Sequence, residues 1–164
     1  MYTRLLWVSC LLPLLYALPV ASADNPISIS VGAGINYTGY GAAVGYSWEH
    51  SSISVSAGLM TSSRIYGEHF GGGISYQRND LLSQYFDNPE KHAFGLYAGT
   101  VGTRFDNFGL GGYRYEPLYG AALTYNYFFN GFHDRGFHVG AFLGYGANSN
   151  ANATPAGLQL GYRF

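Results

Sequence analysis

Few side chains in this sequence have the types and spacing needed for chemistry. His50, Ser51 and Ser52 place a base beside two hydroxyls, which is the composition of a nucleophilic catalytic pair. No acidic group follows at a spacing that a strand would bring next to them. His133 and His138 could present two imidazoles, but no further metal ligands accompany them. We therefore predict no catalytic, cofactor-binding or metal site.

Composition excludes several other classes of protein. Charged residues make up only 10% of the 164 residues, whereas aromatic residues reach 18% and Gly occurs 24 times. Such a chain has too few charges for a coiled coil or a disordered segment. With 8 basic against 9 acidic residues, no basic surface is available for nucleic acid.

The first 23 residues read as a cleaved signal peptide. Arg4 precedes an apolar run over residues 5–20, and Ala21-Ser22-Ala23 supplies the small residues that a signal peptidase requires. A membrane anchor is the alternative, but the run is short and is broken by two prolines. The single cysteine, Cys10, would be removed with the peptide. Residues 24–164 then form one exported domain.

The elements of that domain follow from a period-two alternation, which is typical of β-strands. In residues 40–49 the even positions are apolar and the odd positions are mostly small. The same pattern predicts eight strands, at residues 27–35, 40–49, 53–59, 70–77, 94–99, 121–127, 137–145 and 156–164. In 94–99 the faces are less clear, because Tyr97 falls on the small-residue side.

The chemistry of the two faces predicts where each one points. One face is apolar, and the other is mostly Gly, Ser and Ala, which suits the crowded bore of a small closed barrel better than a surface in bulk water. The apolar face must then point outward, and this is stable only in lipid. The predicted fold is therefore all-β, an eight-stranded antiparallel transmembrane β-barrel.

Aromatic residues on the apolar face support this arrangement. If both chain ends are periplasmic, one group falls at the periplasmic ends of the strands and a second at the outer ends, as expected for belts at headgroup depth. The periplasmic belt is Trp48, Tyr76, Phe94, Tyr127 and Phe137, with Tyr162 and Phe164, and the outer belt includes Tyr40, Phe70 and Tyr145.

The export signal, the eight alternating strands and the terminal Leu160-Gly161-Tyr162-Arg163-Phe164 resemble the small outer-membrane barrels of Gram-negative bacteria. That group includes OmpX, the OmpA membrane domain and the opacity-type surface proteins. The resemblance implies that Leu158, Leu160, Tyr162 and Phe164 form the signal read by the barrel-assembly machinery. It also implies an outer-membrane location, with lipids and lipopolysaccharide as neighbours.

The connections are less regular than the strands. Asn36-Tyr37-Thr38-Gly39 predicts a tight turn. Residues 60–69, 102–118 and 147–155 would be the longer outer loops. The periplasmic connection 78–92 could form helical turns capped by Asn79 and ending before Pro89, or it could be an irregular turn.

Strand direction places Glu49 and Arg163 on the small-residue face near the periplasmic end. The alternation predicts that both point into the bore, about two strand spacings or 10 Å apart, and could form an ion pair there. Glu49 could instead belong to the solvated turn with His50.

We expect a non-enzymatic outer-membrane barrel that displays surface loops and contributes to envelope integrity or surface contacts, with an unknown surface ligand. A narrow pore for water or small solutes is one alternative, since Gly and Ser could leave the bore open. A barrel enzyme that modifies lipid A is the other.

Overall fold

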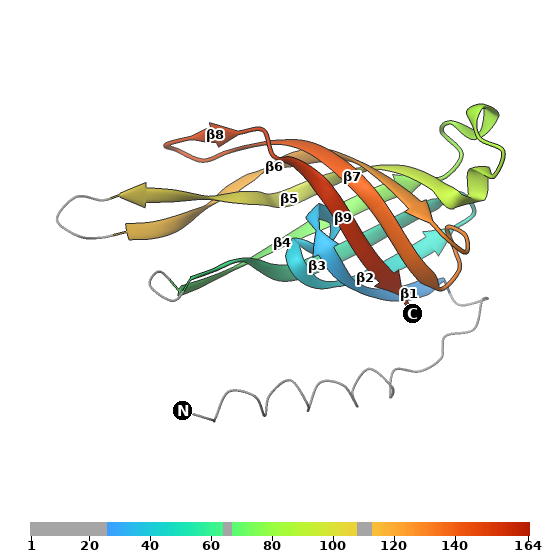
Figure 1. Ribbon diagram of the computed structural model, residues 1–164, viewed down its shortest axis with the longest axis horizontal. Coiled ribbons are helices and arrows are strands. Elements are labelled where there is room, and N and C mark those ends of the chain that lie inside the picture. The colour runs from blue at the N-terminus through green and yellow to red at the C-terminus, as the bar shows by residue number, and fades with distance from the viewer. Residues whose placement is uncertain (1–25, 64–66, 108–112) are drawn as a thin grey trace, which may run out of the picture.

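Antiparallel pairing joins the strands of this chain into one closed wall (Figure 1). The computed structural model describes residues 26–63, 67–107 and 113–164, and the predicted signal peptide lies outside these residues. Neighbouring strands follow the order β6-β5-β4-β3-β2-β1-β9-β7, and β6 also pairs with β7 to close the circle. The predicted all-β, eight-stranded antiparallel barrel is confirmed.

Each predicted strand corresponds to one strand of the wall. The strands are β1 (Ile27–Gly34), β2 (Gly39–Trp48), β3 (Ser51–Ser63), β4 (Gly67–Arg78), β5 (His92–Asn107), β6 (Tyr113–Phe128), β7 (Gly136–Ala147) and β9 (Ala156–Arg163). A two-residue strand, β8 (Asn152–Ala153), pairs with the end of β7 inside the predicted loop 147–155. We call the end at which β1 begins and β9 finishes the terminal end, and the opposite end the hairpin end.

Two predicted outer loops are largely strand. The β3–β4 and β5–β6 hairpins extend past the rest of the wall at the hairpin end (Figure 1), so the predicted loops at 60–69 and 102–118 are wrong for most of their length. Beyond the wall a strand no longer needs one apolar and one small-residue face, so its sequence loses the alternation while its pairing continues, as in Thr103↔Pro117. The Thr61 and Thr103 hydroxyls, 2.7 Å apart, link the two hairpins.

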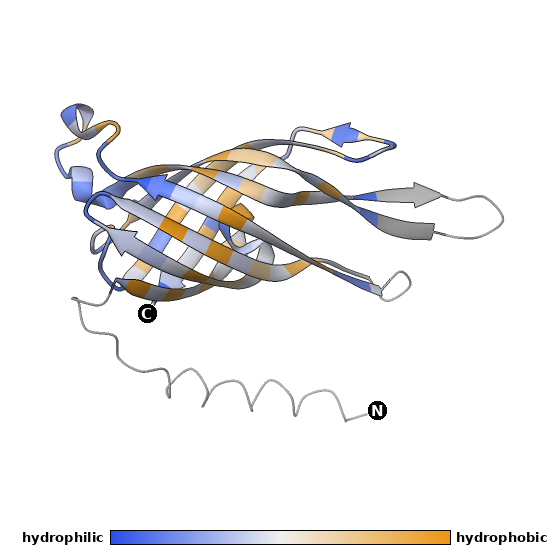
Figure 2. Cartoon of the chain, turned by 180° about the vertical axis from the view of Figure 1, so that it is seen from behind, coloured by the Kyte–Doolittle hydropathy of each residue, from blue (hydrophilic) through white to orange (hydrophobic). Residues whose placement is uncertain are grey.

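Within the wall the alternation is confirmed by burial. Along β2 the even positions are exposed and Ala43 and Gly45 are buried, and apolar residues alternate with other residues in the same way on the neighbouring strands (Figure 2). Tyr97, whose face the sequence left unclear, points inward and is 1% exposed. No helix in the described ranges is long and apolar enough to cross a membrane.

The chain turns at residues 36–39 as predicted, because β1 ends at Gly34 and β2 begins at Gly39, but this turn is buried. Ile35–Tyr37 form a short 3-10 helix, η1, and Ile35, Asn36, Tyr37 and Thr38 are all buried. The chain therefore folds into the bore between β1 and β2 instead of turning in solvent above it (Figure 1). We call residues Ile35–Thr38 the turn plug.

A row of glycines makes room for the turn plug. Pairing places five inward-facing glycines in register across five adjacent strands, namely Gly161, Gly32, Gly41, Gly58 and Gly71. A Cβ at any of them would meet an atom of Tyr37 or Thr38 at 2.1–2.7 Å, closer than real Cβ contacts allow. The plug can enter only because no side chain stands in this row.

The connection between β4 and β5 differs in detail from the prediction. It contains two 3-10 turns, η2 (Ser83–Tyr85) and η3 (Pro89–Lys91), and Asn79 does not cap a helix. Arg78 instead binds Asp80 through two hydrogen bonds of 2.8 and 2.5 Å. This bonding lowers the pKa of the Asp80 carboxyl, and it fixes the start of the connection locally.

The glycine row predicts an asymmetry between two substitutions. Gly32→Ala would place a Cβ 2.4 Å from the Leu160 carbonyl oxygen and 2.5 Å from the Tyr37 ring, so we expect a loss of about 1–3 kcal/mol in unfolding free energy. Gly102→Ala is the matched control, because its Cβ would meet only Leu118 at 3.7 Å. Urea unfolding in detergent micelles measures both, and equal stability of the two variants would contradict the close approach of the plug.

Candidate functional site

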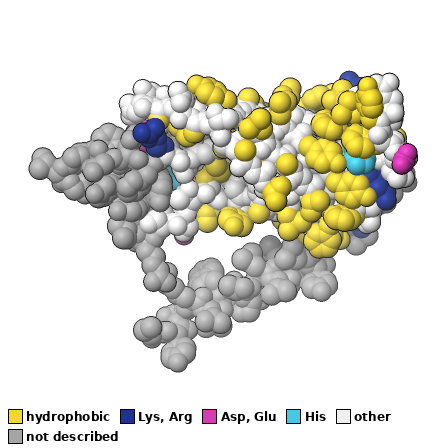
Figure 3. Space-filling view, turned by 45° about the horizontal axis from the view of Figure 1, so that its top comes forward, with side chains coloured by type: hydrophobic (Ala, Val, Ile, Leu, Met, Phe, Trp, Pro, Cys, Tyr) yellow, Lys and Arg dark blue, Asp and Glu magenta, His cyan; other side chains and the backbone are white. Residues whose placement is uncertain are grey.

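Between the two ends of the barrel, the outward face of the wall carries no charge. Its positions in residues 27–33, 40–48, 53–59, 70–76, 94–98, 119–127, 137–145 and 156–164 hold only aliphatic residues, aromatic residues and glycine. Large apolar side chains are exposed on this face, among them Val44 at 56% and Leu123 at 63% exposure. On the side shown in Figure 3, hydrophobic side chains spread along the wall and the visible charged groups lie towards its ends.

The predicted aromatic belt gathers at the terminal end. Trp48 lies against Tyr76 with ring centroids 6.3 Å apart, and Phe137 meets Tyr162 at 4.9 Å. Phe94 packs on Tyr125 and Tyr127 on Phe129, at 5.0 and 5.3 Å. The residues of the predicted assembly signal lie on the same outward face, with Leu158 and Leu160 exposed and Tyr162 against Phe164 at 5.0 Å.

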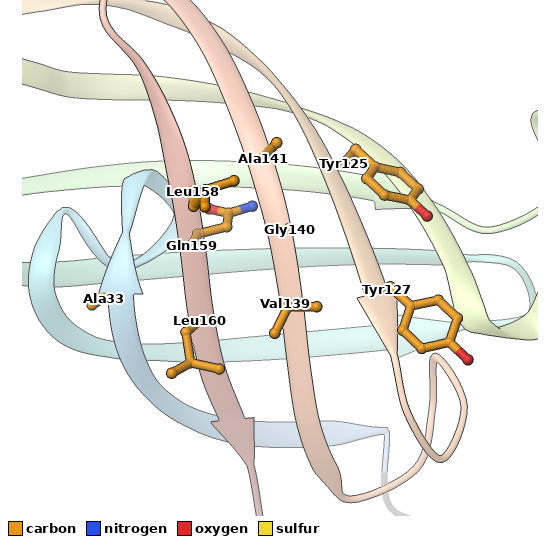
Figure 4. Close-up of a pocket in the computed structure, with 9 residues that line it drawn as sticks. All are labelled: Ala33, Tyr125, Tyr127, Val139, Gly140, Ala141, Leu158, Gln159 and Leu160. Carbon is orange, nitrogen blue, oxygen red and sulfur yellow. The ribbon is translucent and has the colours of Figure 1, made fainter.

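A shallow apolar hollow interrupts this outer face. Val139 and Ala141 of β7 lie between Tyr125 and Tyr127 of β6 on one side and the leucines of β9 on the other (Figure 4). Its volume is about 560 Å³, and small side chains on β7 between larger neighbours create it. Its lining holds no carboxylate, imidazole or thiol, so it offers a shape for hydrocarbon and no catalytic chemistry.

The turn plug is held in the bore by hydrogen bonds from several strands. The Tyr37 hydroxyl lies 2.7 Å from His138 Nε2, and Thr38 Oγ1 lies 2.9 Å from Ser56 Oγ and 3.0 Å from the Tyr97 hydroxyl. The backbone N–H of Asn36 donates to Gln159 Oε1 at 3.4 Å. These bonds satisfy most of the polar side-chain groups that the buried turn brings with it, whereas the side-chain oxygen of Asn36 has no partner.

Apolar side chains fill the bore towards the hairpin end. Ile35 of the turn plug packs with Tyr97, Val101 and Leu118, each at most 4% exposed, and Phe142 lies against them. The plug and this cluster occupy this part of the lumen.

The terminal end is closed by the turn between β6 and β7. Phe128 and Phe132 pack together with Ala93, and all three are almost fully buried. The turn is tied to two neighbouring connections, because the Phe132 amide donates to the Glu90 carbonyl at 2.7 Å and His133 Nε2 lies 2.5 Å from the Glu49 carbonyl. Between the two closures lies a polar cavity of about 20 Å³, enough for one water molecule.

These observations describe a closed antiparallel wall with an apolar exterior and a bore occupied by both polar and apolar side chains. The fold is a closed eight-stranded antiparallel β-barrel. Among solved structures, the N-terminal β-barrel domain of Pseudomonas aeruginosa OprF aligns over 84% of this chain and 96% of its own length, at 16% identity and a TM-score of 0.47. No family model and no curated protein matches the chain.

The barrel does not bring Glu49 and Arg163 together. Arg163 points inward as predicted, but its guanidinium lies over the rings of Phe128 and Phe132, 4.9 and 5.6 Å from their centroids, and donates to the Phe132 carbonyl. Glu49 is exposed in the β2–β3 turn, where its φ of 40° turns the chain out of the strand. The predicted ion pair is absent because β2 ends one residue before Glu49.

The histidine and serine residues singled out in the sequence form no catalytic set. The Ser51 hydroxyl lies 3.1 Å from the Tyr76 hydroxyl, and no hydrogen bond joins it to His50. His133 and His138 are separated, since one lies in the β6–β7 turn and the other is buried in the bore. In the described part of the chain, no three His, Cys, Asp or Glu side chains gather in a way that could hold a metal ion.

Sequence reasoning missed the residues that close the barrel. The sequence predicts a tight turn at Tyr37 and Thr38 but not its burial, and it gives Phe132 no role. A signal was present, since Gly32, Gly41 and Gly58 occur at inward positions of consecutive predicted strands. Their common register becomes evident only when the strands are paired.

The contact between the plug and the wall predicts a measurable coupling. Tyr37→Phe removes the hydroxyl bonded to His138 and leaves a buried imidazole nitrogen unpaired, which should lower the unfolding free energy by about 1–3 kcal/mol. Tyr145→Phe, at a tyrosine exposed on the outer wall, should change it by less than about 0.5 kcal/mol. In a His138→Leu background Tyr37→Phe should have a smaller effect, and full additivity would contradict the contact.

Proposed function

We propose that this chain is an integral outer-membrane barrel with a closed lumen. In this proposal it neither conducts solutes nor catalyses a reaction, and it acts by displaying its hairpins at the cell surface and by its presence in the envelope. The observation that carries the proposal is the uncharged, apolar outward face that runs around a closed wall.

The outer surface of this wall would be unfavourable in water and favourable in a lipid bilayer. In water, the exposed side chains typified by Val44, Leu123 and Leu158 would form an apolar surface far larger than monomeric soluble proteins carry. In a bilayer the same surface is satisfied by hydrocarbon. The closed ladder then leaves no unpaired strand edge in the belt, as a membrane requires.

The belts suggest an orientation. Trp48, Tyr76 and Phe137 at the terminal end suit the inner headgroup layer, while Tyr40 and Phe70 near the hairpin end suit the outer layer, where lipopolysaccharide would be the neighbour. The long β5–β6 hairpin would then stand above the membrane. Nearby, the side-chain amides of Asn148 and Asn150 donate to Glu116 at 3.3 and 3.4 Å, which ties the β7–β9 connection to this hairpin.

The two alternatives fit the barrel less well. A pore needs a continuous water path, whereas the turn plug and the Phe128–Phe132 pair lie inside the bore, and the polar cavity beside them has a volume of only about 20 Å³. A lipid-modifying enzyme needs a base beside its nucleophile, and Ser51 is paired with Tyr76 instead of His50.

Localisation tests the proposal directly. After expression with its signal sequence in a Gram-negative host, the protein should fractionate with the outer membrane and migrate faster on a gel when unboiled, because the folded barrel resists detergent. Recovery in the soluble periplasmic fraction, with no shift on boiling, would overturn the membrane assignment.

The outward face predicts that the loss of folding stability on introducing an arginine depends on where the arginine is placed. Leu123→Arg places a charge near the expected bilayer midplane and should lower folding stability in lipid vesicles by about 2–4 kcal/mol. Asn150→Arg, at an exposed position in the β7–β9 connection, should cost little. Equal folding free energies for the two variants in urea titrations would contradict the assigned faces.

The end of the chain predicts an effect on assembly. We propose that Leu158, Leu160, Tyr162 and Phe164 are read by the barrel-assembly machinery, so deleting Phe164 should reduce outer-membrane insertion in cells much more than refolding into detergent. Leu81→Ala, at an exposed apolar residue of the β4–β5 connection, is the control that should alter neither. An equal loss in cells and in detergent would mean that Phe164 only supports the fold.

A further inference from the structure

The bore contains a buried positive charge that no carboxylate neutralises. Arg163 is only 8% exposed, and its Nε has no hydrogen-bond partner. One of its terminal nitrogens donates to the Phe132 carbonyl, and its plane lies over two phenyl rings. These contacts compensate part of the charge, because the ring faces and the carbonyl oxygen are only partially negative.

The nearby acidic groups are all engaged elsewhere or directed outward. Glu49, Glu90 and Asp134 are exposed in their connections, and Asp80 is paired with Arg78 at 2.5 Å. Arg163 forms no ion pair with any described carboxylate, that of the chain end included. A buried cation without a counter-charge is costly, and buried charges in proteins are normally paired.

Arg163 also lines the small polar cavity between the two closures. The other polar groups around it include His138 and the hydroxyls of Ser28, Ser30 and Ser52. Hydroxyls can rotate to donate towards whatever occupies the cavity. Its volume of about 20 Å³ admits a particle of roughly the size of a water molecule and excludes phosphate, sulfate or a carboxylate ligand.

We propose that this cavity is a binding site for a halide ion, with chloride as the ion at hand in the envelope. The guanidinium supplies the charge and the free Nε–H supplies a donor, while the serine hydroxyls complete the coordination. Two amide side chains, Asn36 and Gln77, line the same cavity with an unpaired oxygen each. Either amide can turn by 180° to present its NH₂ group to the anion.

A single water is the competing occupant. Water can accept from Nε and bridge to the Gln77 oxygen, but it brings no charge, so Arg163 would remain buried without a counter-ion. A halide would accept a hydrogen bond from Arg163 Nε and would also neutralise the charge of its guanidinium. It also explains why a bore with so few charged groups can keep this arginine inside.

The test uses the folded barrel in detergent micelles at constant ionic strength. Sodium gluconate, whose anion is too large for the cavity, is replaced stepwise by sodium chloride or sodium bromide, and the urea midpoint of unfolding is recorded. We expect the midpoint to rise with halide and then to saturate, as binding to the folded state alone requires. An unchanged midpoint in gluconate, chloride and bromide would overturn the proposal.

Two variants separate a site from a general salt effect. Arg163→Met should abolish the saturable response, whereas Arg78→Met, which removes a partly exposed arginine bound to Asp80, should retain it. If both variants and the unmodified barrel show the same halide dependence, the site is excluded.

Bromide diffraction gives a readout that does not depend on a variant folding. Crystals of the unmodified barrel grown in bromide should show an anomalous peak within hydrogen-bond distance of Arg163 Nε. Density at that place without anomalous signal would identify water and would refute the halide.

Discussion

The narrow bore of an eight-stranded barrel is the constraint on which the rest of this structure depends. Closing eight strands leaves an interior that side chains alone just fill, so inserting any backbone requires that wall side chains be removed. The row from Gly161 through Gly32, Gly41 and Gly58 to Gly71 removes them along one track. The backbone of the turn plug, the Tyr37 ring and the Thr38 side chain occupy the space that five side chains would have taken.

That exchange determines the polarity of both faces. Along the glycine row the inward positions carry no side chain, so the bulky apolar residues of these strand segments stand on the outward face. Tyr37 and Thr38 bring polar groups into the bore, where His138, Ser56 and Tyr97 bind them. The barrel therefore combines a bore in which many polar groups are hydrogen-bonded with an apolar exterior, which is the reverse of a water-soluble domain.

Sequence reasoning reached the fold because each wall strand must satisfy two different surroundings at once. Residues 40–48 and 53–59 record that requirement as strict alternation. The extensions of β5 and β6 were missed because a hairpin beyond the wall faces one medium on both sides. The turn plug was missed for another reason: Asn36-Tyr37-Thr38-Gly39 has local turn chemistry, while its burial depends on glycines from five strands. Inward placement of Arg163 was predictable from strand position, but the exposure of Glu49 depended on where β2 ends.

Ion conductance tests the central claim, that the turn plug and the β6–β7 turn seal a membrane-spanning barrel. The protein is refolded into vesicles, its folded state is verified by the gel shift on heating, and the vesicles are fused with a planar bilayer. A sealed barrel should give no current steps above the leak of the protein-free bilayer over a wide range of voltage. Reproducible unitary currents from the unmodified barrel would contradict a sealed lumen.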